Sequence, residues 1–523
     1  MPKVRGKKTM GSGMQELTEV AVAAAAVDAG AVTQSLSETI HSRIDMVNGW
    51  VWGWPMLVLL LGTGLYLTVG LGFMPLKKIG YAFGELFKGR KPEGEGDVTP
   101  FAALMTALSS TIGTGNIAGV AVAIALGGPG ALFWMWMTAL VGMATKFAEG
   151  VLAVKYREVD HRGRRVGGPM YYIKNGMGKG FVWLGGLFAL FGILAGLGTG
   201  NYIQTAEVVQ TVHATYGVEY FITGGIIALL AGLVILGGIK RIASVAEKVV
   251  PAMAGSYILI GLVVVIINYT SIPAAFGQIF AGAFGFGAVA GGFSGALLML
   301  AMQRGVARGI FSNEAGQGSA PIAHAAAQND DPVNQGIIAM LGTFIDTIMV
   351  CSITGLAILT SGVIPEGCDV GILLQLQQTG AAAAESCTIG APITAEAFES
   401  VLPGIGAHVV TIALAIFAFT TILGWSYYGE RCAEYVFGEW IIFPFRLAWI
   451  AMILAATGLF YAGDDINAMM ATVWLATDTL TGMMAAPNLI ALLVLSPLVF
   501  KMTKDYFADL EAGNAPKTDA SDG

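Results

Sequence analysis

Charged residues are scarce in this chain of 523 residues, of which only 12% are Asp, Glu, Lys or Arg. Soluble domains carry roughly a quarter charged residues, so the composition argues against a soluble protein. Long stretches contain no charged residue at all, namely 98–145, 180–206, 249–303, 400–429 and 479–500. Because a spanning helix needs about 20 apolar residues, these stretches predict an all-α polytopic membrane protein.

Residues that build metal centres and catalytic sites are also few. The four cysteines form no CxxC pair, the five histidines are scattered, and no phosphate-binding GxxxxGK[ST] motif is present. These patterns lack the spacing of a metal site or a catalytic set. A basic stripe for nucleic acid is missing as well, so neither an enzyme nor a nucleic-acid-binding protein is favoured.

Glycine, by contrast, is abundant, with 72 residues, and glycine is common in membrane helices. Hydropathy predicts eleven spans, or twelve if the long last segment crosses twice. The predicted spans are 50–76, 101–128, 130–154, 183–212, 220–238, 249–268, 293–325, 335–362, 404–428, 441–461 and 467–500.

Lysine and arginine are distributed unevenly over the loops between these spans. Three basic loops alternate with three that contain no Lys or Arg; the former are 77–97, 155–179 and 240–248, the latter 207–219, 269–292 and 361–406. The positive-inside rule therefore predicts that the first three are cytoplasmic. The N-terminus is then outside, despite its four basic residues, and Lys501 and Lys504 favour a cytoplasmic C-terminus.

The N-terminal tail and one exterior loop leave alternatives open. Residues 1–48 read as a poorly ordered tail or surface helix, or as a cleaved signal peptide whose apolar part is interrupted by acidic residues. Loop 361–406 contains Cys368 and Cys387, which either form a disulfide in the external compartment or remain free thiols. Cys351 and Cys432 lie in or near spans and are expected to be packing residues.

Two related stretches interrupt predicted spans. Asn116–Gly119 and Asn313–Gly316 both read N-x-A-G, and about five spans begin with each. Because the loop charges give the two halves opposite directions, the pattern predicts a 5+5 inverted repeat with one extra peripheral N-terminal helix. The expected units are a tail 1–48, a peripheral helix and loop 49–97, a first repeat 98–270, a second repeat 271–500 and a C-terminal tail 501–523.

The stretch STIGTGNIAGV, 110–120, is a poor helix former at membrane depth. Glycine in a helix interior costs about 1 kcal/mol relative to alanine, and non-helical backbone is tolerated there only against protein or a watery cavity. A break exposes N–H groups that suit a carboxylate and C=O groups that suit a hard cation. Glycines that serve helix packing are the simpler alternative, but they leave the two asparagines unexplained.

The stretches TALSSTIGTGNIAGVAVAIALGGPGALFWMW, GIFSNEAGQGSAP, TTILGWSYYGE and MMAAPNLIALL resemble the alanine or glycine:cation symporter family over about residues 50–505. The resemblance implies a leucine-transporter-like fold. It also implies symport of small neutral amino acids with Na⁺, or less often H⁺, across the cytoplasmic membrane. A monomer that binds no partner beyond the amino acid and the lipid bilayer is expected.

The resemblance also implies roles for individual residues. The substrate carboxylate would meet the side chain of Gln204 and the backbone of Gly113, Thr114, Gly115 and Asn116. The substrate ammonium group would meet Ile310, Phe311, Ser312 and Asn313. Phe311 and Trp425 would cap the substrate side chain. A first Na⁺ would bind Asn116 and the Thr111 carbonyl, and a second the Ser109 and Ile112 carbonyls with Thr420 and Thr421.

Each role has a simpler alternative. The two threonines could bond back to helix carbonyls, Trp425 could be a core aromatic, Gln204 needs a polar partner anyway, and Asn313 could cap a half-helix.

Charged residues inside the spans are functional hypotheses by default. Lys146 and Glu149, three residues apart, are expected to form a structural pair. Arg304, Arg308 and Glu314 flank the second break and could form a gate, and Asp346 or Asp478 would be the proton site if H⁺ drove transport.

Overall fold

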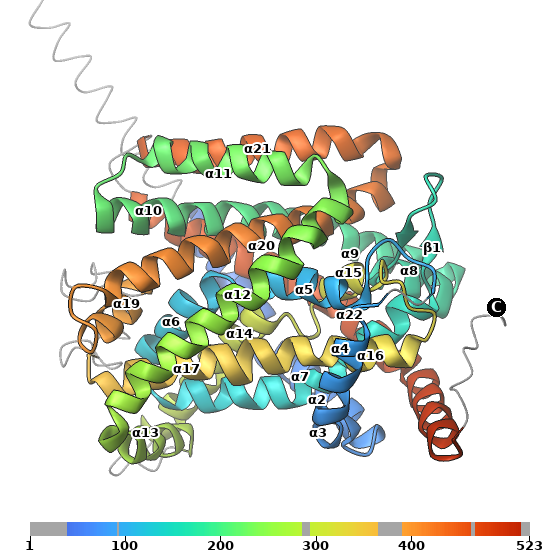
Figure 1. Ribbon diagram of the computed structural model, residues 1–523, viewed down its shortest axis with the longest axis horizontal. Helices are drawn as coiled ribbons and strands as arrows, with labels where there is room; N and C mark the ends of the chain where they lie inside the picture. Colours follow the sequence, from blue (N-terminus) through green and yellow to red (C-terminus); the bar gives the residue numbers. More distant parts are fainter. Residues whose placement is uncertain (1–38, 92–93, 285–292, 364–389, 462–465, 514–523) are drawn as a thin grey trace, which may run out of the picture.

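The structure is a computed structural model that describes residues 39–91, 94–284, 293–363, 390–461 and 466–513. These residues are mostly helical (Figure 1). A short antiparallel hairpin joins β1 (Glu158–Val159) to β2 (Arg165–Val166).

Among the described residues, eight helices are long and apolar enough to cross a membrane, and two further helices form a span bent by 55°. The eight are Thr39–Gly70, Gly130–Lys155, Lys179–Tyr216, Gly238–Ile267, Pro332–Ser361, Gly406–Phe437, Glu439–Tyr461 and Thr472–Glu511, and the bent pair is Pro100–Thr111 with Gly115–Gly127. The prediction of a multi-pass helical membrane protein is therefore confirmed. The count of eleven or twelve spans and the 5+5 arrangement remain predictions.

The elements of the first part of the chain are α2 (Trp54–Gly70), α3 (Met74–Lys77), α4 (Ile79–Lys88), α5 (Pro100–Thr111), η1 (Gly115–Gly119), α6 (Val120–Gly127), α7 (Gly130–Lys155), α8 (Pro169–Tyr172), η2 (Ile173–Met177), η3 (Lys179–Phe181), α9 (Val182–Ala195), η4 (Gly196–Ile203), α10 (Gln204–Tyr216), α11 (Tyr220–Ile235) and α12 (Gly238–Ile267). Those of the second part are η5 (Tyr269–Ser271), α13 (Ile272–Phe284), α14 (Phe293–Asn313), α15 (Ala320–His324), α16 (Pro332–Thr343), η6 (Phe344–Cys351), α17 (Ser352–Ser361), α19 (Ala391–Glu399), α20 (Gly406–Phe437), η7 (Glu439–Ile441), α21 (Ile442–Gly458), η8 (Leu459–Tyr461) and α22 (Ile466–Glu511).

Some boundaries differ from the predicted ones. The predicted loops 269–292 and 361–406 contain the helices α13 and α19, because both segments have apolar residues to bury. The last predicted span, 467–500, lies within one continuous helix, α22, rather than two. The first long helix begins at Thr39, inside the predicted tail.

The loops predicted to lie on opposite sides of the membrane lie at opposite ends of the molecule. Figure 1 shows the β1 hairpin and α8 at the right end and α13 and α19 at the left end. Helices α11 and α21 lie side by side along one edge. The side of the membrane on which each loop lies stays a prediction.

Two buried helices that lead into the centre have well-defined starts. The Thr99 side chain accepts the N–H of Ala102, and a proline follows Thr99 at the first position of α5. Asp331 accepts the N–H groups of Val333 and Asn334 at the start of α16. Such caps satisfy backbone donors that the first helical turn leaves free, and they position α5 and α16.

Candidate functional site

The first broken helix is confirmed at the position that the glycine-rich stretch predicts. Helix α5 ends at Thr111, and helical structure resumes at Gly115 as a π-turn, η1. The side-chain oxygen of Asn116 accepts the N–H of Gly113 at 2.9 Å. A Cβ on Gly113 would lie 2.5 Å from Oγ1 of Thr421, so the close approach of α20 requires glycine here.

Gln204 of α10 lies against this first break. Its Oε1 accepts the N–H of Thr114 at 3.2 Å, and its Nε2 donates to the Thr199 carbonyl at 3.2 Å. Thr114 and Gln204 are both predicted to bind the substrate carboxylate, and here the Thr114 N–H donates to the Gln204 side chain instead. An incoming carboxylate would have to share or displace this contact.

The second break is also confirmed. Helix α14 ends at Asn313, and residues 314–319 are not helical. Glu314, Gly316 and Gly318 have positive φ angles of 56°, 89° and 82°. This conformation is ordinary for glycine but strained for glutamate. The Asn313 side-chain oxygen accepts the N–H of Ala315 at 2.9 Å, which forms a side-chain turn directly after α14.

The second break is held by side chains from other helices. Oε1 of Glu149, on α7, accepts the N–H groups of Gly316 and Gly318 at 3.1 and 3.2 Å. It also accepts Nδ2 of Asn488, on α22, at 2.7 Å. Glu149 makes no ion pair with Lys146 within 4.0 Å, so the predicted pairing is wrong. The carboxylate serves the backbone of the break instead.

Asp346, on η6, contacts residues of both breaks. Its Oδ1 accepts Nδ2 of Asn116 at 2.7 Å, and its Oδ2 accepts the hydroxyls of Ser312 at 2.7 Å and Thr347 at 2.8 Å. Asp346 is 0% exposed. Among the described residues, no cationic side chain lies within 4.0 Å of it. The sequence marked Asp346 as an isolated intramembrane carboxylate and a candidate proton site, but gave no sign of its contacts with both breaks.

The residues predicted to bind an ammonium group are largely engaged with the protein. Ser312 donates to Asp346, and Nδ2 of Asn313 donates to the Thr347 hydroxyl at 3.1 Å. The Ile310 carbonyl accepts Nε2 of Gln317 at 2.9 Å. An ammonium at this position would exchange these contacts for its own.

The predicted second cation site is assembled in part. Oγ1 of Thr421 donates to the Ile112 carbonyl across the α5–α20 contact at 3.3 Å, and to the Phe417 carbonyl at 3.0 Å. Thr420 instead bonds back to Phe417 at 2.9 Å, which is the simpler alternative for a threonine in a helix. The structure thus brings together Ile112 and Thr421.

The hydroxyls of Ser109 and Thr111 also bond within their own helix, to the carbonyls of Thr106 and Leu108. The α5–α20 approach is close here, because a Cβ on Gly424 would lie 2.8 Å from Oγ of Ser109. The carbonyls of Ser109 and Thr111, rather than their hydroxyls, remain the expected cation ligands.

Two aromatic side chains flank the breaks. A Cβ on Gly115 would lie 3.1 Å from the Phe311 ring, so Phe311 faces the first break. Trp425 is 2% exposed, and its Nε1 donates to Oε1 of Glu314 at 2.8 Å. A Cβ on Gly200 would lie 2.3 Å from Cβ of Trp425, so the η4 backbone packs directly against this side chain.

An ion pair covers Phe311 on the side of α22. Nη2 of Arg308 lies 3.1 Å from Oδ2 of Asp478. The guanidinium also lies 5.4 Å from the Phe311 ring and 5.2 Å from the Trp474 ring, within the range of a cation–π interaction. The predicted gate of Arg304, Arg308 and Glu314 is not formed as one contact, because Arg308 pairs with Asp478 and Glu314 bonds to Trp425.

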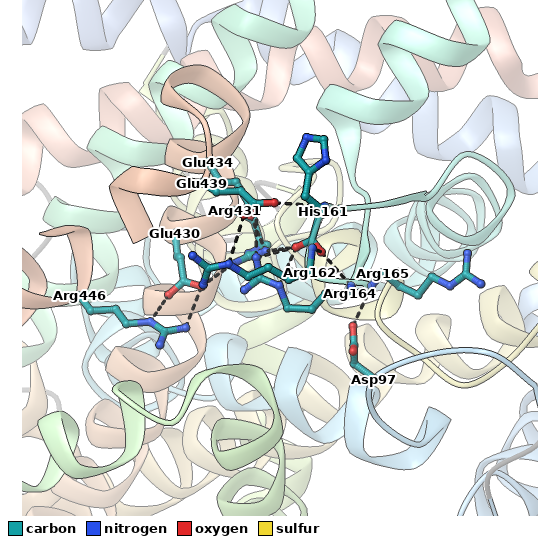
Figure 2. A network of polar contacts seen from close by, with 11 residues as sticks. Asp97, His161, Arg162, Arg164, Arg165, Glu430, Arg431, Glu434, Glu439 and Arg446 are labelled. Carbon is teal, nitrogen blue, oxygen red and sulfur yellow. Dashed lines mark hydrogen bonds and ion pairs between the residues drawn. The ribbon is translucent and has the colours of Figure 1, made fainter. Parts of the chain in front are cut away.

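A second charged cluster lies between the hairpin and the ends of α20 and α21 (Figure 2). Asp160 accepts the backbone N–H groups of Arg162 and Arg164 at 2.9 and 2.8 Å, and Nε of Arg164 at 2.6 Å. Arg164 also pairs with Glu434 at 3.1 Å. Burial alone would raise the pKa of Asp160, but the hydrogen bonds from Arg164 and Arg162 hold it below the usual value.

The same cluster reaches the residues before α5. The guanidinium of Arg446 contacts Glu430 at 2.5 and 3.1 Å, and Arg431 also pairs with Glu430. The Asp97 carboxylate accepts the backbone N–H of Arg165 at 2.9 Å, and burial raises the pKa of Asp97. Figure 2 thus shows segments far apart in the sequence joined near the start of the first broken helix.

The cysteine predictions divide between described and undescribed residues. Cys351 and Cys432 are both buried free thiols. Cys351 does more than pack, because its Sγ lies 3.3 Å from Nδ2 of Asn116 and 3.2 Å from Oγ of Ser312. Cys368 and Cys387 lie outside the described residues.

The family model described as the sodium:alanine symporter family matches residues 37–520. The chain belongs to the sodium:alanine symporter family. It is 49% identical over 471 residues to the sodium/alanine symporter AgcS of Methanococcus maripaludis, covering 89% of this chain and 97% of that protein. It is 47% identical over 477 residues to an uncharacterized transporter of Haemophilus influenzae, covering 90% and 97%.

A third relative is the putative sodium/proton-dependent alanine carrier protein YrbD of Bacillus subtilis, 38% identical over 477 residues, or 90% of this chain and 94% of that protein. The family resemblance inferred from the motifs is confirmed. The family member described here is a secondary transporter in the membrane, not an enzyme, and its class is Na⁺-coupled amino-acid symport.

Proposed function

We propose that this symporter carries small neutral amino acids, alanine or glycine with D-alanine as a further candidate, together with Na⁺. The substrate carboxylate meets the backbone N–H groups of the first break and Gln204. Its ammonium group meets the end of α14. The two breaks lie close enough for one small molecule to reach both, because Phe311 packs against Gly115.

The observation that carries the proposal is the buried carboxylate of Asp346. It joins the two breaks through neutral donors only. A buried carboxylate without a cationic partner is costly, and a bound Na⁺ would offset that cost. Hard cations prefer carboxylate and hydroxyl oxygens, which Asp346 and Ser312 offer together, and the Asn116 amide oxygen lies at the same break, where it accepts the N–H of Gly113. Asp346 therefore joins Asn116 and the Thr111 carbonyl as a ligand of the first Na⁺.

The size of the substrate follows from the aromatic walls. Trp425 is held by Glu314 and Gly200, and Phe311 by its contact with the first break. In the proposed site these two rings limit the substrate side chain to a hydrogen or a methyl group. Larger side chains would need one of the rings to move.

Transport follows an alternating-access cycle in the cytoplasmic membrane. The two five-helix halves, 98–270 and 271–500, rock around the central site, with the N-terminus outside and the C-terminus in the cytoplasm. The protein acts as a monomer, because each half contributes one break to a site that is complete within one chain.

Alanine binding with and without Na⁺ tests the proposal, in the wild type and in Asn116→Ala. Na⁺ should strengthen alanine binding to the wild type, and the variant should lose this dependence. In proteoliposomes, an inward Na⁺ gradient should drive alanine accumulation. Uptake that ignores the Na⁺ gradient but follows a pH gradient would replace Na⁺ by H⁺ as the coupling ion. A competition panel with serine, proline and glutamine identifies another small substrate.

A further inference from the structure

Lys146, on α7, is a buried lysine without a direct partner. The residue is 2% exposed, and its Nζ makes no hydrogen bond with the protein. Among the described residues, no carboxylate lies within 4.0 Å of this ammonium. Buried charges are normally paired, and an ionisable residue inside a span is expected to have a function.

Three buried carboxylates surround Lys146 at longer range. Glu149, Glu314 and Asp346 all interact electrostatically with its ammonium group. Glu149 is engaged with the backbone of the second break, and Glu314 with Trp425 and Ser319. Asp346 is the carboxylate proposed to bind Na⁺. Three carboxyl groups thus lie within electrostatic range of one ammonium group, so Lys146 can pair with only one of them at a time.

The face of α7 that carries Lys146 leads toward Asp346. Gly142 lies one turn before Lys146, and a Cβ there would lie 3.4 Å from Cγ2 of Thr343 and 4.0 Å from Oδ1 of Asn313. Thr343 lies one turn before Asp346, and its hydroxyl makes no hydrogen bond with the protein. A polar, unsatisfied hydroxyl thus lies on the route between the ammonium and Asp346.

We propose that Lys146 is a tethered counter-cation that takes the place of Na⁺ at Asp346 when the carrier is empty. This proposal rests on the Na⁺ site proposed above. The flexible four-carbon stem of lysine lets the ammonium move, and Na⁺ and the ammonium compete for one carboxylate. The empty carrier then returns across the membrane without an uncompensated charge at its centre.

The proposal predicts different effects on net uptake and on exchange, because these two transport modes differ in the return of the empty carrier. Net uptake includes the return of the empty carrier, whereas exchange of internal for external alanine at saturating Na⁺ uses only the loaded carrier. Lys146→Gln should slow net uptake by about tenfold and leave exchange within about twofold of the wild type. Lys146→Arg keeps the charge and should restore much of the net uptake.

Na⁺ affinity gives a second, independent measurement. Because the ammonium competes with Na⁺, its removal in Lys146→Gln should strengthen Na⁺ binding, by about tenfold if the competition is strong. Damage to the fold would weaken Na⁺ binding instead. Lys248→Gln removes an exposed lysine of α12 and is the matched control, with wild-type behaviour expected in both measurements.

Two results would overturn the proposal. One is an equal loss of net uptake and exchange in Lys146→Gln, which would assign the lysine a structural role. The other is weakened or unchanged Na⁺ affinity in that variant. If Lys146→Gln does not fold, Lys146→Met, which also removes the charge, is measured in its place and is judged by the same two results. A wild type without Na⁺-driven alanine uptake or exchange would instead contradict the proposed function.

Discussion

The two helix breaks are chemically different although an N-x-A-G sequence lies at each. The first is held by neutral amides: Asn116 accepts the N–H of Gly113, and Gln204 accepts that of Thr114. The second is held by a carboxylate, since Glu149 accepts two backbone N–H groups of residues 314–319. The first break contains no charged side chain, so a bound ligand would supply any charge there. At the second break, Glu149 already occupies two of the backbone N–H groups.

This difference suggests a division of labour between the breaks. The first break offers weakly held N–H and C=O groups, which a zwitterion and a cation can use. The second break is strained at Glu314 and fastened to α7 and α22, so it acts as a preformed wall. Asp346 connects the two, and variants of these residues test whether ligand binding and stability separate in this way.

The largest effect is expected for Asp346→Asn, which removes the charge shared by the breaks. The amide still fills the space but no longer attracts a cation, so Na⁺-dependent alanine binding should fall by about a hundredfold or more. Equilibrium binding over a Na⁺ titration measures this effect. Asp505→Asn, at an exposed position of α22, is the control. Unchanged Na⁺ dependence in Asp346→Asn would remove the first cation site as described.

Gly113→Ala comes next, because its Cβ would lie 2.5 Å from Oγ1 of Thr421. The clash should separate α5 from α20 and weaken Na⁺ affinity by about 10- to 50-fold, through the Ile112–Thr421 contact. Gly342→Ala is a matched control, since its Cβ would make only an ordinary contact at 3.6 Å. Equal effects of the two variants on Na⁺ affinity would argue against a cation site at this contact.

Glu149→Gln tests the second break. Glutamine keeps an acceptor for the backbone N–H groups but loses the charge, so the free energy of unfolding should fall by about 1–3 kcal/mol. Thermal unfolding in detergent measures this loss, and alanine affinity of the folded protein should change little. A large change in affinity at constant stability would contradict the division of labour.

The smallest effect is expected for Gln204→Ala at the first break. The Thr114 N–H then loses its acceptor but gains access to the substrate carboxylate, so the two consequences partly cancel. Alanine affinity should fall by about two- to fivefold, with thermal stability within about 1 kcal/mol of the wild type. Isothermal titration of alanine at saturating Na⁺ measures it. An unfolded or strongly destabilised Gln204→Ala would mean that this neutral contact is structural.

Local features of the site could be predicted from the sequence because they depend on neighbouring residues. The breaks at residues 112–114 and 314–319 lie where glycine and asparagine cluster, and both residue types have low helix propensity. The Ile112–Thr421 contact was reached only through the family resemblance. The predicted Lys146–Glu149 pair is wrong because the spacing of two residues on one helix gives no information about other segments. Here Gly316, Gly318 and Asn488 donate hydrogen bonds to the Glu149 carboxylate instead.

The amino-acid sequence by itself determined the membrane class and the two breaks, since both depend on local composition. The tertiary structure alone decided which side chains serve those breaks. Asp346 lies 230 residues from Asn116, and Asn488 lies 339 residues from Glu149, yet each pair is hydrogen-bonded. Such partners are chosen by helix packing that buries polar groups together, because an unsatisfied polar group inside the membrane is too costly to leave alone.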